Sequence, residues 1–367
     1  MERYYLAALN AVNLIGTKTL QKLIEKFGSA ENIWRAEISQ LTEAGFNQKI
    51  IDNFIEFRSK HPDAVEKLVE FCNVRKIKIC TTYDENYPPL LKQTSAEPII
   101  FYYRGEIIPD AERIAIVGTR GATPYGEKVS KKLSAELAAA GFTIVSGAAK
   151  GIDTFAHQAA LKNGRTVAVL GYGINKIPHD KQKLFEEIVA GGGVVMTEFP
   201  PNSDGNTGTF PARNRIIAGL SRGVIVVEAG EKSGALITAN RAADFSRDVF
   251  VVPHSVFSPK SAGCHNLIRE GAILIKGSDD VLEEYHLKNK KIAPEIESEE
   301  KILTSPKIEL EGAEKLIYEA IPQDESITLD EILINVDEVS PAEISEIMLQ
   351  LELKNLILEN DGKYSRK

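Results

Sequence analysis

From residue 113 onward, short apolar segments alternate with segments of helical character. The predicted strands cover residues 114–117, 143–145, 167–170, 194–196, 224–227, 249–252 and 272–275. Such alternation is typical of a mostly parallel sheet with helices on both faces, because the helix between two parallel strands packs back on the sheet. The sequence therefore predicts an α/β domain over residues 73–285, and we expect an extension at 77–101 to pack beside its sheet.

The first part of the chain, residues 1–72, is predicted to be a separate helical domain. Apolar residues recur at helical spacing as far as Phe27, and Gly28 ends that helix. The segments 14–19 and 41–49 resemble the turns of helix-hairpin-helix or SAM-like units, which can offer backbone N–H groups to a phosphate. Plain packing of helices explains the same pattern, and the sequence leaves both explanations open.

The last part of the chain divides into a linker and a small domain. Residues 286–311 are charged and rich in Lys, Glu and Pro, which is typical of a flexible linker. Residues 312–367 read as three helices and a hairpin that turns at Asp361-Gly362, which together predict a winged helix. Its third helix is acidic, so we expect a protein partner or a structural role rather than DNA binding. The acidic residues of that helix are Glu343, Glu346 and Glu352.

The net charge of −8 conceals an uneven distribution along the chain. Residues 112–277 hold 20 Lys and Arg against 14 Asp and Glu, whereas residues 278–367 hold 10 against 23. The basic middle would attract nucleic acid and the acidic end would repel it. No apolar segment resembles a signal peptide or a membrane span, and the three cysteines lack metal-type spacing. We therefore expect a cytoplasmic protein with no metal, no cofactor and no membrane partner.

The distinctive polar residues cluster where the predicted strands end. Ligands of open parallel sheets gather at the carboxyl ends of the strands, where glycines let a phosphate approach the backbone and Arg and Lys add positive charge. Phe210, Arg213 and Arg215 also open an apolar helix, and an aromatic ring beside two guanidiniums suits a polyanion. The alternative is that these arginines pair with carboxylates. The candidate DNA-binding residues are Gly118, Thr119, Arg120, Ser146, Gly147, Lys150, Gly151, Phe210, Arg213, Asn214, Arg215, Lys232, Ser233 and Gly234.

An enzyme is the rival hypothesis, and its signals are weaker. Lys232-Ser233 lacks both glycines that precede these residue types in a P-loop, and Ser146 lacks the flanking glycines of a hydrolase nucleophile. Asp153 and His157 stand four residues apart on one predicted helix and could form an acid–base pair. A structural explanation is favoured, in which Asp153 caps the helix or pairs locally and His157 fills a partly buried polar position. No catalytic residue is predicted.

Taken in order, these motifs resemble the DprA/Smf family, the DNA-processing protein A family. The resemblance is strong over about residues 77–275 and looser on either side of them. The matching segments are residues 116–120, 146–153, 210–220, 227–229, 233–238 and 266–272.

The resemblance implies a Rossmann-like domain that binds single-stranded DNA, protects incoming DNA and hands it to the recombinase RecA during natural transformation. It implies no catalytic step. Matched by motif, Arg120 and Arg213 would bind phosphates, Phe210 would contact a base, and Ser146 and Gly147 would offer a hydroxyl or N–H group. It also implies a homodimer. The expected dimer-contact residues are His265, Leu267 and Ile268.

The chain departs from the family pattern at three places. Lys150 stands where Arg is usual, residues 177–179 stand where Tyr-Pro is usual, and His254 replaces a usual Gly. Nucleotide-binding or nucleotide-cleaving Rossmann-like enzymes are a related alternative. Phosphoribohydrolases of that type carry a Pro-Gly-Gly-x-Gly-Thr-x-x-Glu motif, which is missing from residues 229–234.

Overall fold

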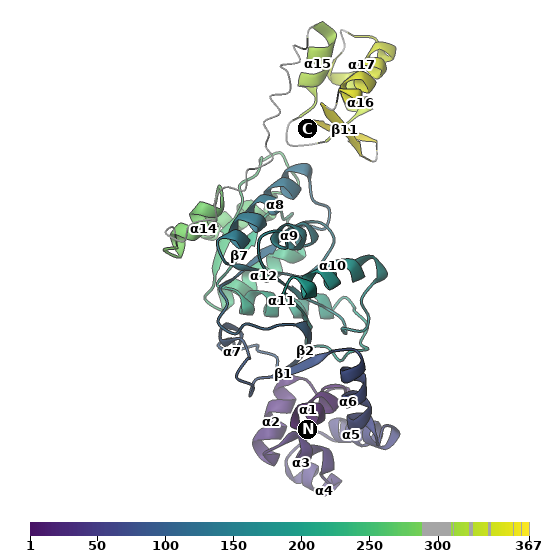
Figure 1. Ribbon diagram of the computed structural model, residues 1–367, viewed down its shortest axis with the longest axis vertical. Coiled ribbons are helices and arrows are strands. Elements are labelled where there is room, and N and C mark those ends of the chain that lie inside the picture. The colour runs from purple at the N-terminus through teal and green to yellow at the C-terminus, as the bar shows by residue number, and fades with distance from the viewer. Residues whose placement is uncertain are drawn as a thin grey trace.

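The computed structural model shows a large central sheet with helical units toward both ends of the chain (Figure 1). The described residues are 1–287, 310, 312–322, 326–336, 339–354, 356–360 and 362–366. Most of the predicted linker, 286–311, lies outside them. No helix among the described residues is long and apolar enough to cross a lipid bilayer.

The central sheet is mostly parallel and has the order β1-β2-β6-β5-β4-β3-β7-β8-β9. All seven predicted strands are present, from β3 to β9, and each is parallel to its neighbours among them. The predicted extension forms β1 and β2, and β2 pairs antiparallel with β6 at one side of the sheet. The strands are β1 (Lys78–Thr81), β2 (Ile100–Gly105), β3 (Arg113–Val117), β4 (Thr143–Ser146), β5 (Thr166–Val169), β6 (Val194–Thr197), β7 (Gly223–Val226), β8 (Asp248–Val251) and β9 (Ile273–Leu274).

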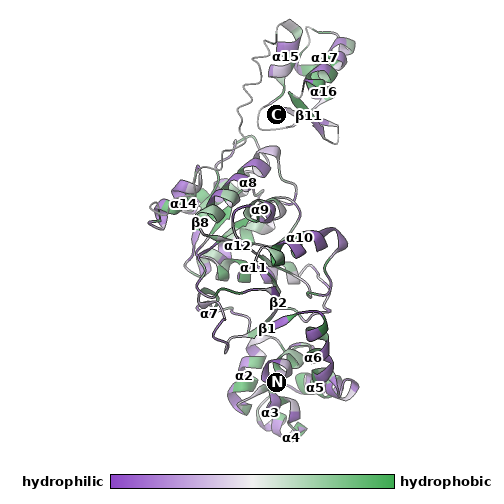
Figure 2. Cartoon of the chain, in the orientation of Figure 1, coloured by the Kyte–Doolittle hydropathy of each residue, from purple (hydrophilic) through white to green (hydrophobic). Residues whose placement is uncertain are grey.

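Helices cover both faces of the sheet, as predicted. One face packs on α11 (Thr209–Leu220), α12 (Gly234–Asp244) and α13 (Ala262–Arg269), and short α7 (Pro89–Lys92) contacts α11. The other face packs on α8 (Pro124–Ala139), α9 (Ile152–Ala160), α10 (His179–Ala190) and α14 (Ser278–Glu284). Most of α10 is hydrophilic (Figure 2), and its buried residues are Leu184, Phe185 and Ile188. Strands that are buried on both faces explain why the apolar segments of the sequence run without a polar alternation.

Six helices form the N-terminal unit and share a core with the sheet edge. The predicted helix at residues 20–27 lies within α2, which ends at Gly28 with a left-handed φ of 77°. The Tyr102 hydroxyl of β2 donates to the Ala7 carbonyl at 3.3 Å, within that shared core. Binding of phosphate by the turns of this unit stays a prediction. The helices are α1 (Glu2–Asn10), α2 (Thr17–Phe27), α3 (Ala30–Arg35), α4 (Ile38–Glu43), α5 (Gln48–Lys60) and α6 (Ala64–Val74).

The C-terminal unit has the predicted winged-helix elements. Its three helices enclose a separate apolar core, and its three antiparallel strands have the order β10-β12-β11. Asp361 of the predicted turn lies outside the described residues. The elements are α15 (Gly312–Ala320), β10 (Ile327–Thr328), α16 (Leu329–Asn335), α17 (Pro341–Leu353), β11 (Ile357–Asn360) and β12 (Lys363–Arg366).

Candidate nucleic-acid interface

A pocket of about 830 Å³ opens at the carboxyl ends of the parallel strands. Its walls come from the loop after β3, the loop and first turns of α11, and the loop that opens α12. This position is where ligands of open parallel sheets bind. The predicted residues that line it are Gly118, Thr119, Arg120, Phe210, Arg213, Asn214, Lys232, Ser233 and Gly234.

Arg213 forms the floor of this pocket and is only 6% exposed. Its Nη1 donates to the Gly147 carbonyl at 2.7 Å and to the Val169 carbonyl, and its Nε donates to Asn214 Oδ1 at 3.1 Å. Burial lowers the pKa of Arg213 to about 10, although the Asp153 carboxylate acts in the opposite direction. The guanidinium therefore ties the ends of two strands together, and most of its donors are already used.

The turn after β4 is held beneath Arg213 by a buried carboxylate. Asp153 Oδ2 accepts the N–H of Gly147 at 3.1 Å and of Ala149 at 3.3 Å. A Cβ at position 147 would lie 2.6 Å from Arg213 Nη2 and 2.8 Å from Asp153 Oδ2. Burial raises the pKa of Asp153, and the charge of Arg213 opposes that rise. Glycine at 147 is thus required because the Arg213 guanidinium and the Asp153 carboxylate both pack closely against it.

Arg120 and Phe210 lie together at the mouth of the pocket. The Arg120 guanidinium carbon is 5.9 Å from the centre of the Phe210 ring, and Arg120 is exposed to solvent. Tyr172 packs edge-on against Phe210 with ring centres 6.4 Å apart. A Cβ at Gly171 would lie 2.6 Å from the ring, so glycine there makes room for Phe210. A cation above a partly exposed ring can hold a phosphate and a stacked base at once.

The loop that opens α12 supplies the opposite wall of the pocket. Ser233 caps this helix by accepting the Ala235 N–H at 3.3 Å, and Gly234 lies in its first turn. Lys232 beside them is exposed. Unpaired N–H groups at a helix start and a nearby lysine favour an anion. In the described part of the chain, neither Lys232 nor Arg120 forms an ion pair, so both cations are available.

Ser146 and Arg215, like Arg213, use their side chains within the protein. Ser146 is fully buried, and its hydroxyl donates to the Ile116 carbonyl at 2.7 Å. Arg215 forms a two-pronged ion pair with Glu198, at 2.7 and 2.6 Å. Pairing of an arginine with a carboxylate, the alternative from the sequence, therefore describes Arg215.

Lys150 and Gly151 lie on the turn that leads into α9, beside the pocket wall. Gly151 has a φ of 84°, and a Cβ there would lie 2.5 Å from the Thr119 carbonyl oxygen. Lys150 is exposed. Gly151 thus brings this turn against the loop after β3 and leaves Lys150 free to reach a ligand outside the pocket.

Lys181 is a cation that the sequence did not single out. It lies on α10 and donates to the Ala148 carbonyl, and its charge interacts with those of Asp153, Arg213 and Arg120. Burial lowers the pKa of Lys181. It follows no glycine-rich segment, so no local pattern marks it. Lys260, from the loop before α13, also lines the pocket without a sequence signal.

Asp153 and His157, the residues considered for catalysis, have side chains that are bound to other groups of the fold. His157 is fully buried, its Nδ1 lies 2.6 Å from Thr166 Oγ1, and burial lowers its pKa to about 3. Asp153 accepts the N–H groups of Gly147 and Ala149, so each of the two side chains contacts other groups of the fold. Among the described residues, no group of three His, Cys, Asp or Glu side chains could hold a metal ion.

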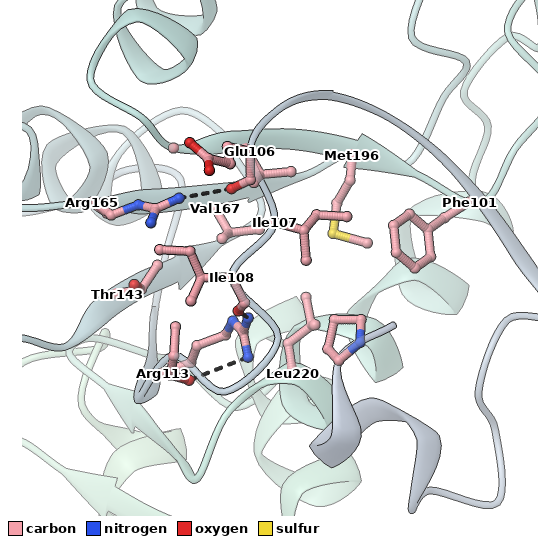
Figure 3. A pocket seen from close by; sticks show the side chains of 14 residues that line it. Phe101, Glu106, Ile107, Ile108, Arg113, Thr143, Arg165, Val167, Met196 and Leu220 are labelled. Atoms are coloured by element: carbon pink, nitrogen blue, oxygen red, sulfur yellow. Dashed lines mark hydrogen bonds between the residues drawn. The ribbon is translucent and has the colours of Figure 1, made fainter. Parts of the chain in front are cut away.

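A small cavity of about 20 Å³ lies at the other end of the parallel strands, near their amino ends (Figure 3). There Arg113 donates to the carbonyls of Pro109 at 3.0 Å and Ala111 at 3.2 Å, and Arg165 donates to the Glu106 carbonyl at 2.7 Å. The loop between β2 and β3 therefore covers the amino ends of the strands, whereas the large open pocket lies at their carboxyl ends.

Comparison with known proteins agrees with this geometry. Residues 78–286 match the family model of DNA recombination-mediator protein A. The chain is 36% identical to Protein Smf of Synechocystis over 405 residues, which covers 100% of this chain and 99% of that protein. It is 43% identical to the DNA processing protein DprA of Streptococcus pneumoniae over 208 residues, which covers 55% of this chain and 72% of that protein.

Two solved structures share the fold. The DNA processing protein A of Streptococcus pneumoniae has a TM-score of 0.65 and 34% identity, and the match covers 77% of this chain and 98% of that one. The Helicobacter pylori protein has a TM-score of 0.52 and 29% identity, and covers 57% and 96%. The latter structure is described as giving insight into a single-stranded DNA binding mode.

Proposed function

This chain belongs to the DNA recombination-mediator protein A family, and we propose that it is a cytoplasmic protein that binds single-stranded DNA, protects it and loads RecA onto it during natural transformation. The proposal contains no catalytic step. It depends above all on Arg120 over the Phe210 ring, at the mouth of a pocket of about 830 Å³. Bases of a single strand can stack on such a ring, whereas those of a duplex are covered by their neighbours.

The predicted site residues take two roles in this proposal. Arg120, Lys150, Lys232 and the N–H groups near Gly118 and Gly234 contact the DNA backbone. Arg213, Gly147, Gly151, Ser146 and Arg215 are positioning residues, because their polar atoms or close packing hold the strand ends in place. Thr119, Ser233 and Asn214 lie between these groups along the pocket wall.

The experiment for this function measures two properties of the same full-length protein. The first is its affinity for oligo-dT against a duplex of equal length. The second is the rate at which RecA forms filaments on single strands that carry a single-strand-binding protein. We expect preference for the single strand and faster filament formation. Equal binding of duplex would contradict the first expectation, and an unchanged RecA rate would contradict the second.

We also propose that the chain forms a homodimer through the side of the sheet at β9. Leu267 is only 7% exposed and belongs to the core, whereas Ile268 is partly exposed, and Leu274 of β9 is 47% exposed. Because β9 is the last strand of the sheet, its outer edge is free to meet a second copy. Of the predicted contact residues, Ile268 offers apolar surface there, and His265 is half-buried.

A substitution at Ile268 tests the dimer. Ile268→Arg places a charge in the proposed contact without disturbing the buried Leu267, so we expect a folded monomer in sedimentation velocity. Ile38→Arg, at a residue that is 50% exposed on the N-terminal unit, serves as the matched control and should remain dimeric. A wild-type chain that is monomeric at micromolar concentration, or an Ile268→Arg variant that stays dimeric, would contradict the proposal.

The winged helix is proposed to bind a protein partner. Leu349 and Leu353 are 58% and 79% exposed, and they lie four residues apart on α17 among its acidic residues. Exposed apolar side chains on an acidic helix suit a basic amphipathic segment better than a phosphate backbone. Loss of oligo-dT affinity on removal of this unit would contradict the assignment.

A further inference from the structure

A second pocket, of about 460 Å³, lies where the N-terminal helices meet the sheet. Its lining residues include several of α10, Arg104 of β2 and Arg75 at the end of α6, and Figure 1 shows where these elements lie. It shares no lining residue with the strand-end pocket. Apolar and polar side chains share its walls. The apolar lining residues are Ile174, Ile177, Phe185, Val189, Ala190 and Val195, and the others are Arg75, Arg104, Asn175, Gln182 and Glu186.

The walls of this junction pocket are held by a continuous core. Tyr102 of β2 and Ile174 belong to the same buried cluster as Leu6 and Leu9 of the N-terminal helices. Asn10 Nδ2 also donates to the Glu198 carbonyl at 3.2 Å. The pocket is therefore a fixed feature of the junction, formed by elements that pack together on both sides.

Two guanidiniums face this pocket, from Arg75 and Arg104. Arg104 Nε is buried and has no hydrogen-bond partner, and in the described part of the chain neither arginine forms an ion pair. Arg75 donates to Asn175 Oδ1 at 2.7 Å and lies 5.4 Å from the centre of the Phe71 ring. Burial lowers the pKa of Arg104, and the charge of Arg75 lowers it further. A bound anion would reduce the repulsion between the two guanidiniums and could accept hydrogen bonds from Arg104.

The same pocket contains one carboxylate, that of Glu186. It lies close enough to Arg104 to favour the charged guanidinium, but its side chain is exposed on α10 and does not pair with Arg104. Glu186 therefore offsets part of the positive charge without satisfying the Arg104 donors. A ligand anion would compete with Glu186 for Arg104.

We propose that the junction pocket binds a carboxylate that carries an apolar group. The planar guanidinium of Arg104 matches a carboxylate with two parallel hydrogen bonds, and Arg75 adds a second positive charge. The apolar side chains of the lining favour an apolar ligand body, which gains free energy by leaving water, and Asn175 and Gln182 add polar groups beside them. A free carboxylic acid and the last residue of a peptide chain both have this chemistry.

The test is isothermal titration calorimetry on the full-length protein with N-acetyl-phenylalanine. Its amide, N-acetyl-phenylalaninamide, has the same ring without the charge and is the matched ligand control. We expect saturable binding of the acid with one site per chain and no binding of the amide. A hexapeptide with a C-terminal phenylalanine distinguishes the sources, because a site for chain ends will bind it more tightly than the single residue.

Three variants locate the site. Arg104→Gln should lower the affinity for N-acetyl-phenylalanine by about tenfold or more, which is the effect of losing a hydrogen bond to a charged group. Glu186→Gln removes the competing carboxylate and should strengthen binding. Arg35→Gln removes an arginine of the N-terminal unit that pairs with Glu31 and should change nothing.

Some results would overturn the proposal. These are an absence of binding to wild type at millimolar acid, equal binding of acid and amide, and equal affinity of Arg104→Gln and wild type. Melting temperatures of the variants verify folding, and substitution at Arg104 removes a donor that already lacks a partner. Oligo-dT affinity is measured on the same samples and should be the same with and without the acid. Failure of DNA binding would thus not contradict the carboxylate site, and failure of carboxylate binding would not contradict the proposed DNA-binding function.

Discussion

Arg213 lies at the carboxyl ends of the parallel strands and Arg113 at their amino ends, and the two side chains have similar surroundings. They are 6% and 3% exposed, and burial lowers the pKa of each to about 10. Each donates to backbone carbonyls, Arg213 to those at the ends of β4 and β5 and Arg113 to those of the loop before β3. The cavity beside Arg213 is about 830 Å³, whereas that beside Arg113 is about 20 Å³. A buried arginine is thus a structural feature of both edges. The exposed cations and the aromatic ring around Arg213 are what differ, and they mark the candidate site.

The largest expected effect is the loss of stability in Arg213→Ala. The change removes the guanidinium whose charge most opposes the desolvation of the buried Asp153 carboxylate. Removing one partner from two interacting buried charges costs about 3–5 kcal/mol. We expect a large fall in the urea midpoint and a smaller fall for Arg113→Ala, because Arg113 has no buried carboxylate beside it. A fully stable Arg213→Ala variant that fails to bind DNA would show that Arg213 acts on the ligand instead.

Acid pH should also destabilise the folded protein, through His157. Burial lowers the pKa of this ring to about 3, so the folded protein keeps it neutral down to about that pH, whereas the unfolded chain binds the proton near the ordinary histidine pKa of 6.5. Between these values the unfolded state holds the extra proton, so stability falls as pH falls, by about 1.4 kcal/mol per pH unit. Urea midpoints from pH 7 to 5 measure this. His157→Gln should flatten the dependence, and an unchanged slope would contradict the assignment.

The sequence predicted the fold of the central sheet better than the roles of single side chains. Buried strands such as Ile114–Val117 stand out because a strand covered on both faces must be apolar. The glycines were also informative, since the chain approaches Arg213 at Gly147. However, no sequence pattern distinguishes an arginine that faces a pocket from one that faces a carboxylate.

The difference depends on residues far apart in the chain. Arg215 meets Glu198, 17 positions earlier, and Arg213 meets Gly147, 66 positions earlier. Lys181 reaches the site from a helix with no phosphate-type motif. These contacts follow from how the crossovers place the helices, so only the three-dimensional structure shows them.

Phe210→Leu sharpens the comparison at the open edge. Leucine keeps an apolar side chain against Gly171 but removes the ring face on which a base can stack. We expect about tenfold weaker oligo-dT binding, at the low end of about 1–3 kcal/mol per stacked base, with little change in melting temperature. Fluorescence anisotropy measures the affinity. Unchanged binding would exclude stacking at this ring.

Removal of residues 288–367 should have the smallest effect on DNA binding. The deleted part is acidic, so its loss removes a repulsive field and leaves oligo-dT affinity equal or slightly higher. Anisotropy at two salt concentrations measures this. A clear decrease in affinity would mean that the winged helix contacts DNA and that the interface extends beyond the sheet edge.

The most direct test of the central claim is the salt dependence of oligo-dT binding by wild type and Arg120→Gln. Arg120 is exposed and lies over Phe210, so this change should leave folding intact. We predict at least about tenfold weaker binding and a log–log salt slope shallower by about 0.7, the value for one phosphate contact of a single strand. Arg35→Gln should match wild type in both. Equal affinity and slope for Arg120→Gln and wild type would contradict the claim that DNA binds at this pocket.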